Sequence, residues 1–226
     1  MKLLLLGAGK TGKLVAEVAR ERGHEVEGLR SSENRHASGL TRERLAPIDM
    51  VMDFTTPDCV LENIRASVAA GKSMVVGTTG WYSEISKVRA EVEARGTAFV
   101  YGSNFSIGVN IFFDLVQAAA PALQHQYSPH IYERHHAQKK DAPSGTAVTI
   151  QALLRQNSDL EIEVTSFREG EVVGMHEVVL DSTDDTIYLC HDAKSRRGFA
   201  EGAVRAAEWL AGKKGFFDFK DTWREV

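Results

Sequence analysis

The sequence predicts an α/β protein in which a doubly wound parallel sheet is followed by a second domain of the α+β class. A glycine-rich turn near the N-terminus lies between an apolar strand and a helical pattern. Four further apolar runs then alternate with helical patterns up to about residue 104. Beyond it, a long helical pattern and three β-rich runs follow without that alternation. We therefore expect the first domain at residues 1–104 and the second at residues 105–196.

The length and composition are those of a soluble globular chain. Its 226 residues suit one and a half to two domains. Hydrophobic residues make up 43% of the chain and charged residues 26%, as is typical of soluble proteins. The formal net charge of −4 argues against a nucleic-acid-binding protein.

The cysteines and the N-terminus indicate a compartment. Only two cysteines occur, Cys59 and Cys190, far apart and without metal-ligand spacing. We therefore expect reduced thiols, no metal site and a cytoplasmic location. The apolar run that follows Lys2 has only four residues, which is too short for a signal peptide. We also expect no segment that is long and apolar enough to span a membrane.

The glycine-rich turn has the spacing of a dinucleotide-binding loop of the Rossmann type. It follows the strand Lys2–Leu6 and precedes a helical pattern over residues 13–20. In such a turn the first glycine allows a tight bend, the second lets a pyrophosphate approach the backbone, and the third lets helix and strand pack closely. A purely structural turn is the alternative. The predicted cofactor contacts are Gly7, Ala8, Gly9, Lys10, Thr11 and Gly12.

The end of the second strand, Glu25–Leu29, indicates which nucleotide is bound. A site selective for NAD usually has an acidic residue here, which binds the ribose hydroxyls. This chain instead has Arg30 followed by two serines, which suit the 2′-phosphate of NADP. Glu33 follows closely and could still accept a ribose hydroxyl. We expect NADPH, with NADH possible; an exposed polar loop is the alternative.

Three more strands complete the predicted parallel sheet, at residues 49–53, 73–76 and 98–101. Thr56 and Pro57 predict the cap and first turn of a helix that reaches residue 70, and a further helix is expected at residues 83–94. Ligands of such sheets bind at the carboxyl ends of the strands. The loops at residues 77–80 and 102–105 lie at such ends.

The second domain is expected to begin with a helix at residues 107–123, with apolar residues at Ile107, Ile111, Leu115 and Val116. The β-rich runs at residues 160–167, 176–181 and 186–190 predict a mixed or antiparallel sheet. We expect this domain to bind the substrate and to mediate oligomerisation. Residues 197–226 are expected to form a helix that returns to the first domain.

Residues 132–147 hold adjacent histidines, His135 and His136, followed by Lys139. The sequence Asp-Ala-Pro-Ser-Gly-Thr at residues 141–146 predicts a turn leading into a helix, because its proline and serine suit a helix start. A helix N-terminus binds anions, and a lysine and histidines beside it indicate an acidic substrate. A polar loop with incidental histidines is an equally open alternative.

Residues 133–147, Glu-Arg-His-His-Ala-Gln-Lys-Lys-Asp-Ala-Pro-Ser-Gly-Thr-Ala, resemble the signature of the dihydrodipicolinate reductase family of bacterial lysine biosynthesis. The Asp-Phe-Thr, Gly-Thr-Thr-Gly and Ser-Asn-Phe-Ser-Ile-Gly-Val-Asn sequences that follow three strands also resemble this family, as do residues 191–210. The resemblance implies a cytoplasmic homotetramer that uses NADPH or NADH. It also implies reduction of 4-hydroxy-tetrahydrodipicolinate to tetrahydrodipicolinate, in the diaminopimelate route to lysine.

The resemblance also implies roles for individual residues. The family's two acid residues fall on His135 and Lys139. The second histidine and the helix start would hold a substrate carboxylate, which names His136, Ser144, Gly145 and Thr146. The two remaining loops would line the nicotinamide, which names Gly77, Thr78, Thr79, Gly102, Ser103, Asn104 and Phe105.

One segment departs from the family pattern. Only three residues separate the Arg-Glu-Gly turn at 168–170 from Gly174, where the family usually has a longer segment. The subunit contacts and any loop that closes over the substrate therefore stay open.

Two other functional classes also stay open. One is another two-domain NAD(P)-dependent dehydrogenase of amino-acid metabolism, which would need a catalytic cysteine or a differently spaced base. The other is a non-catalytic nucleotide-sensing protein, which would be expected to lack His135 or Lys139.

Overall fold

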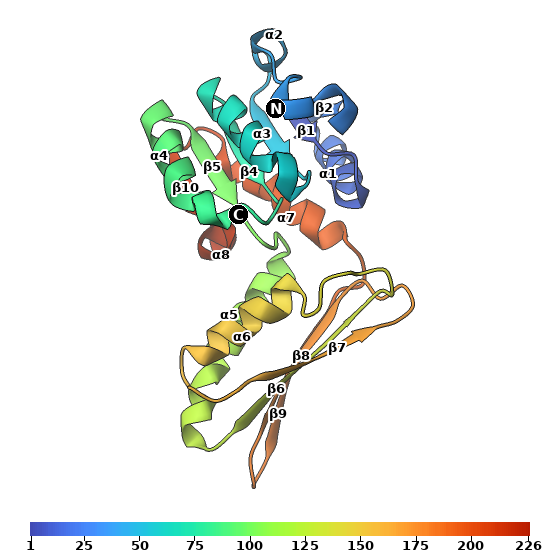
Figure 1. The fold of residues 1–226 in the computed structure, drawn as a ribbon, viewed down its shortest axis with the longest axis vertical. Coiled ribbons are helices and arrows are strands. Elements are labelled where there is room, and N and C mark those ends of the chain that lie inside the picture. The colour runs from blue at the N-terminus through green and yellow to red at the C-terminus, as the bar shows by residue number, and fades with distance from the viewer. The chain divides into compact units, whose positions relative to one another are not determined.

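The computed structural model describes residues 1–226, which divide into two compact units (Figure 1). Unit 1 comprises Met1–Ser106 and Arg197–Val226, and unit 2 comprises Ile107–Arg196. The first boundary lies two residues beyond the position expected from the sequence. The C-terminal segment belongs to unit 1.

Unit 1 is built on a six-stranded sheet whose neighbouring strands are all parallel. Most of its residues are buried because helices cover both faces, which explains the nearly continuous apolar runs in the sequence. The strand order is β10-β5-β4-β3-β1-β2. The strands are β1 (Lys2–Leu6), β2 (Glu25–Leu29), β3 (Met50–Asp53), β4 (Ser73–Val76), β5 (Ala98–Tyr101) and β10 (Gly215–Asp218).

Helices lie on both faces of this sheet (Figure 1). Since β2 and β3 flank β1 on opposite sides, right-handed crossovers place the connecting helices on opposite faces. The helix that follows β3 has Thr56 at its cap position and Pro57 in its first turn, as predicted, but the Thr56 hydroxyl does not bond the helix backbone. The helices are α1 (Lys10–Glu21), α2 (Arg42–Leu45), α3 (Pro57–Ala69), α4 (Ile85–Arg95), α7 (Arg197–Leu210) and α8 (Phe219–Thr222).

The prediction of a single helix over residues 197–226 is wrong. The helix α7 ends at Leu210, and the chain turns at Gly212, whose φ is +79°. Strand β10 then pairs with β5, and Phe216 stacks on Phe99 with ring centroids 5.0 Å apart. The C-terminal segment thus contributes the helices α7 and α8 and the sixth strand.

Unit 2 is a four-stranded mixed sheet in the order β7-β6-β8-β9, with α5 and α6 on one face (Figure 1). Strand β6 pairs in parallel with β7 and antiparallel with β8, which pairs antiparallel with β9. Strand β6, which carries the first histidine of the pair, was not expected from the sequence. The elements are α5 (Ile107–Ala119), β6 (Ser128–His135), α6 (Gly145–Arg155), β7 (Glu163–Arg168), β8 (Met175–Asp181) and β9 (Thr186–Asp192).

The first helix of unit 2 differs from its prediction in length and in buried face. Helix α5 ends at Ala119, and the 3₁₀ segment Ala120–His125 follows. Ile111 and Leu115 are exposed, whereas Val109, Phe112, Phe113 and Val116 enter the core. Together, Ile107–His125 are long and apolar enough to span a membrane, which the sequence analysis did not expect. The buried face of this helical segment packs into the hydrophobic core of unit 2, as the core helix of a globular domain does.

Candidate active site

The glycine-rich turn has the geometry of a nucleotide-binding loop. Gly7 has a φ of +99°, and a side chain there would lie 2.3 Å from the Phe54 carbonyl oxygen. A side chain at Gly12 would lie 2.1 Å from the Gly7 carbonyl oxygen. A side chain at Gly9 would meet nothing within 4 Å. The first and third glycines are thus required by the turn and its packing, and the second leaves its backbone open to a ligand.

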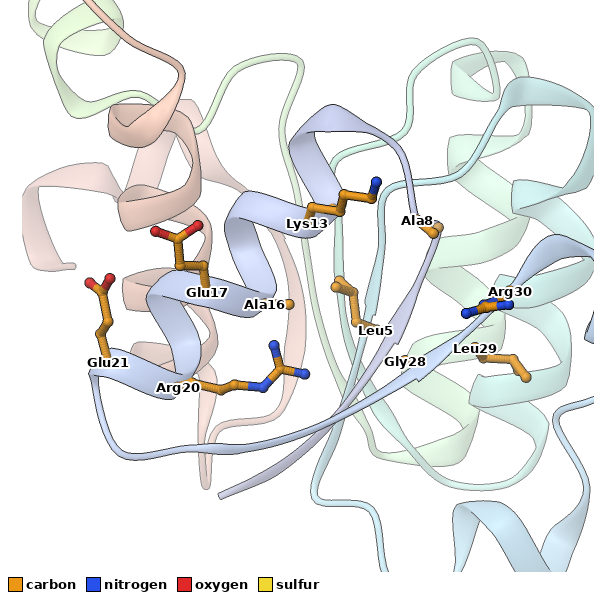
Figure 2. A pocket seen from close by; sticks show the side chains of 12 residues that line it. Leu5, Ala8, Lys13, Ala16, Glu17, Arg20, Glu21, Gly28, Leu29 and Arg30 are labelled. Atoms are coloured by element: carbon orange, nitrogen blue, oxygen red, sulfur yellow. The ribbon is translucent and has the colours of Figure 1, made fainter.

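Two cavities of unit 1 meet at this turn, and both include Gly7 and Leu29 in their linings. The larger, of about 690 Å³, lies between α1 and β2 and is lined by Lys13, Arg20 and Arg30, among others. Figure 2 shows Arg30 at the end of β2, on the side of this pocket where Ala8 lies. The smaller, of about 230 Å³, includes Ser31, Asn34 and Arg35 from the loop after β2.

The acidic residue of the loop after β2, Glu33, already has a hydrogen-bond partner within the protein. Oε2 of Glu33 accepts a hydrogen bond from the Arg30 backbone N–H at 3.2 Å. The Arg30 side chain is exposed, and no carboxylate lies within ion-pair distance of it. The arginine is therefore available for a phosphate, while the glutamate is partly engaged.

A buried carboxylate supports two of the cofactor loops and the loop that lies between them in the sequence. Asp53, at the end of β3, is fully buried and accepts hydrogen bonds from Thr55 at 2.6 Å, Thr78 at 2.7 Å and Asn63 at 2.8 Å. Asn63 in turn accepts from Asn34 in the loop after β2. Burial raises the pKa of Asp53, and these hydrogen bonds oppose the rise. Asp53 thus joins the loops that follow β2, β3 and β4.

In the loops after β4 and β5, close packing leaves no room for a side chain at the glycine positions. A side chain at Gly77 would lie 2.2 Å from the Phe54 ring, and one at Gly102 would lie 3.0 Å from Cβ of Phe219. Phe105 is buried and packs on Phe219 with ring centroids 4.7 Å apart. Four more residues of these loops were predicted to contact the cofactor. The Thr78 hydroxyl donates to Asp53, and the Asn104 side chain accepts a hydrogen bond from the Ser106 N–H. Thr79 and Ser103 are exposed.

His135, one of the two candidate catalytic residues, lies on the helix-covered face of the unit 2 sheet. Alternation along β6 places Glu133 and His135 on the same face. The strand register then places Ser166 of β7 and His176 of β8 opposite Glu133, and Arg168 of β7 opposite His135. Residues far apart in the sequence therefore form one polar cluster.

Glu133 is the centre of this cluster and is fully buried. Its carboxylate accepts hydrogen bonds from the Ser144 N–H at 3.1 Å, the Ser166 hydroxyl at 2.7 Å and the Arg168 guanidinium at 2.7 Å. Burial opposes the charged form, but these donors outweigh it and lower the pKa of Glu133 to about 2. Glu133 is therefore an anion at neutral pH.

Two imidazoles flank the same carboxylate oxygen. Oε2 of Glu133 lies 3.5 Å from Nδ1 of His135 and 3.7 Å from Nε2 of His176. The two rings meet edge to face, with centroids 5.1 Å apart. Burial lowers the pKa of His135 to about 4 and that of His176 to about 3, although the Glu133 anion opposes both shifts. Both rings are therefore neutral at pH 7 in this structure.

Lys139 and His136 lie in the loop that follows β6. The Lys139 ammonium binds both carboxylate oxygens of Asp141, at 2.8 Å each. The backbone carbonyl of Asp141 accepts from Arg168, which ties this loop to the cluster. His136 is partly exposed, and no side-chain hydrogen bond or ion pair involves it.

The start of α6 is capped as predicted. The Ser144 hydroxyl accepts from the Ala147 N–H at 3.2 Å and lies 3.0 Å from Nε2 of His176. Both polar groups of Ser144 are thus used within the protein. Gly145 is exposed, and a side chain there would meet nothing within 4 Å, which leaves room beside the helix N-terminus for an anion.

Comparison with known proteins decides the family. Residues 1–105 match the family described as "Dihydrodipicolinate reductase, N-terminus", and residues 108–222 match "Dihydrodipicolinate reductase, C-terminus". The chain belongs to the dihydrodipicolinate reductase family. The 4-hydroxy-tetrahydrodipicolinate reductase of Christiangramia forsetii is 40% identical over 242 aligned residues, covering 100% of this chain and 99% of that protein. The reductase of the same name from Natronomonas pharaonis is 37% identical, covering 98% of this chain and 100% of that protein.

Solved structures share the fold. The dipicolinate-bound dihydrodipicolinate reductase from Paenisporosarcina sp. TG-14 matches 98% of each chain with a TM-score of 0.78 at 20% identity. An amine dehydrogenase from Mycobacterium smegmatis has a TM-score of 0.66 at 9% identity, covering 98% of this chain and 95% of that chain. The two-domain plan is thus common to several dehydrogenases, and the sequence matches place this chain among the dihydrodipicolinate reductases.

The structure adds residues to the site that the sequence analysis did not name: Glu133, Arg168 and His176. Two of them carry a recognisable signal. The spacing Glu-x-His at residues 133–135 is the two-residue period of a strand, so both side chains share a face. The third residue, His176, lies two positions after Gly174, in the pattern Gly-x-His at residues 174–176. The partner that completes the ion pair, Arg168, follows only from the register of β7.

Glu133, His135 and His176 each offer one ligand atom within 4.8 Å of the others, which is the arrangement of a metal site. The donor set fits a metal ion poorly. The Arg168 guanidinium and two serines already occupy the carboxylate, and a cation would face that guanidinium. The cluster is better explained as a hydrogen-bonded network around an anion.

Proposed function

We propose that this chain reduces 4-hydroxy-tetrahydrodipicolinate to tetrahydrodipicolinate with NADPH, in the cytoplasm, as a step of the diaminopimelate route to lysine. The observation that carries the proposal is the polar cluster of unit 2, in which a neutral His135 lies beside an anionic Glu133 while Lys139 and the start of α6 are held nearby. The family membership of the whole chain supports the same reaction.

The residues of unit 1 fit a dinucleotide. The open backbone at Gly9 suits the pyrophosphate, and the cavity that includes Ser31 and Asn34 suits the adenosine. We assign the loops at 77–79 and 102–105 to the nicotinamide end. The bound nucleotide would supply the hydride, and the protein supplies position and electrostatics.

The charge that develops during reduction defines the role of the unit 2 residues. Loss of water from the 4-hydroxy substrate gives an unsaturated cyclic imine. Hydride addition to this imine leaves negative charge on the substrate, which a proton must neutralise. Lys139 offers ammonium N–H groups for this charge and for a substrate carboxylate. His135 is neutral without substrate. A bound dicarboxylate would raise the pKa of His135, because negative charge favours the imidazolium.

The carboxylates of the substrate would bind between His136 and the first turn of α6. Gly145 and Thr146 present backbone N–H groups at the positive end of the helix dipole. We assign Ser144 an indirect role, since its own groups hold Glu133, Ala147 and His176. Lys139 would exchange Asp141 for a substrate carboxylate, which is the same kind of partner.

We further propose a homo-oligomer, a homotetramer by family resemblance, that forms through the sheet face of unit 2 that α5 and α6 leave uncovered. The register places Phe167 and Tyr188 on this face, and their exposed fractions are 41% and 65%. Large exposed aromatic side chains on a sheet face are typical of a subunit contact.

The cofactor preference can be tested by substitution of one residue. We expect wild-type protein to use NADPH better than NADH, and Arg30→Ala to lower kcat/KM for NADPH about ten- to a hundredfold, as loss of a charged hydrogen bond of about 1.5–3 kcal/mol implies. The value for NADH should change little, because a ribose hydroxyl does not need the guanidinium. Steady-state rates with both nucleotides measure this.

Arg42→Ala provides a control, since this arginine is exposed at the start of α2 and lines neither cavity. Its effect on the ratio of the two cofactors should be smaller. Equal losses for NADPH and NADH in Arg30→Ala, or a wild-type protein that favours NADH, would contradict the assignment of Arg30.

A further inference from the structure

We propose that Glu133 is a positioning residue for the reaction proposed above. It holds His135 in one orientation, with the Nδ1 proton directed at the carboxylate and Nε2 left to exchange a proton with the substrate. The inference rests on the proposed function and adds a residue that acts through His135.

The carboxylate of Glu133 is itself fixed. The guanidinium of Arg168 and the hydroxyl of Ser166 both donate to Oε1 at 2.7 Å, and the Ser144 N–H lies 3.1 Å from both oxygens. A buried carboxylate with these donors has little freedom to rotate. Oε2, which receives only the serine N–H, is the oxygen that faces the two imidazoles.

His135 has one ring nitrogen that needs this oxygen. Nδ1 is buried without a hydrogen-bond partner and lies 3.5 Å from Oε2 of Glu133. A lone pair on Nδ1 would face an anion and be repelled, whereas an N–H there is attracted. The carboxylate therefore selects the tautomer with the proton on Nδ1, as the partner of an imidazole does in other sites.

The ring is also held from its other sides. A side chain at Gly174 would lie 3.1 Å from Nε2 of His135 and 3.3 Å from Cδ2, so a residue with a side chain does not fit beside this edge of the ring without a shift. The ring of His176 packs edge to face against His135 at 5.1 Å. The carboxylate and the second imidazole thus restrict the ring of His135 on two sides.

Glu133 also connects His135 to the start of α6. Its bond from the Ser144 N–H fixes the residue that caps this helix, and the Ser144 hydroxyl reaches Nε2 of His176. One carboxylate therefore sets the position of the proposed proton donor relative to the proposed carboxylate site. Loss of the carboxylate should affect turnover more than the affinity for the substrate.

The charges that face His135 give the sign of the pH effect. Glu133 of β6 and Asp141 of the following loop favour its imidazolium, while Lys139 of that loop and Arg168 of β7 disfavour it. The His176 ring of β8 also faces His135, as a neutral group. Removal of the Glu133 charge therefore lowers the pKa of His135. If His135 must be protonated to act, the alkaline fall of kcat moves to lower pH.

The test compares two variants that disturb His135 in different ways. Glu133→Gln should lower kcat about 10- to 100-fold and shift the alkaline fall of kcat to lower pH. Gly174→Ala, which pushes the ring by a few tenths of an ångström without changing charge, should lower kcat about three- to tenfold and leave that fall in place. Glu161→Gln, an exposed acid just before β7, is the control and should behave as wild type.

A second measurement needs neither variant nor substrate. The ¹⁵N resonances of His135 in the wild-type protein, assigned with His135→Gln, should show a protonated Nδ1 and an unprotonated Nε2 at neutral pH. The opposite tautomer would overturn the proposal, even if Glu133→Gln fails to fold. So would a Glu133→Gln protein with the kcat and pH profile of wild type. Because the tautomer is measured without turnover, failure of the proposed function alone would leave this result unchanged.

Discussion

Replacement of Lys139 by alanine is expected to lower kcat by about 10²-fold or more, the scale on which a positioned acid contributes, while NADPH binds as tightly as before. The ammonium of Lys139 is held by Asp141 at 2.8 Å in the loop that follows β6. Lys139 belongs to unit 2 and the nucleotide-binding residues to unit 1, so we expect the nucleotide site not to respond. Single-turnover rates and nucleotide titration would separate the two effects.

Lys140→Ala is the matched control, because this neighbouring lysine is exposed and pairs with no carboxylate. Its kcat should remain within about twofold of wild type, as expected for a surface charge. A Lys139→Ala protein that turns over at the rate of Lys140→Ala would show that Lys139 is not the acid. A parallel loss of NADPH binding would show that the substitution acts on the fold instead.

Replacement of Asp53 by alanine is expected to lower the free energy of unfolding by about 3 kcal/mol or more. The substitution leaves the buried donors of Asn63 and Thr78 without their acceptor, and each such group costs about 1–3 kcal/mol. It also separates the loops that carry the cofactor residues. Urea unfolding, with the m-value checked for two-state behaviour, measures the change.

Asp49→Ala is the comparison for Asp53. Asp49 is an exposed acid next to β3 and accepts one hydrogen bond, from the Lys2 N–H at 2.6 Å. It should cost less than about 1 kcal/mol. If both variants unfold at the same urea concentration, the buried network does not hold the loops together.

The cofactor-binding half of the fold could be predicted because its determinants are local. The steric demands of Gly7 and Gly12 and the strand–turn–helix order are visible within a dozen residues. The Ser144 cap could be predicted for the same reason. Strand β10, in contrast, is only four residues long and follows a helix, so nothing in its own sequence separates it from a C-terminal tail.

The cluster of unit 2 depends on contacts that a sequence pattern does not show. Strand β6 contains histidines, a glutamate and an arginine, and reads as a polar loop because its charged residues are mostly surface types. Glu133 can be buried there only because Arg168, 35 residues further along the chain, neutralises it. That pairing follows from the parallel register of β6 and β7.

The most direct test of the proposed reaction measures the loss of NADPH absorbance with 4-hydroxy-tetrahydrodipicolinate freshly made from pyruvate and aspartate semialdehyde. Wild-type protein should oxidise NADPH only when the substrate is present, with one tetrahydrodipicolinate formed per NADPH. The His135→Ala variant should lose most of this rate while still binding NADPH. The proposed reaction at this site would be contradicted if the wild-type protein did not oxidise NADPH when the substrate is present. It would also be contradicted if His135→Ala oxidised NADPH at the wild-type rate.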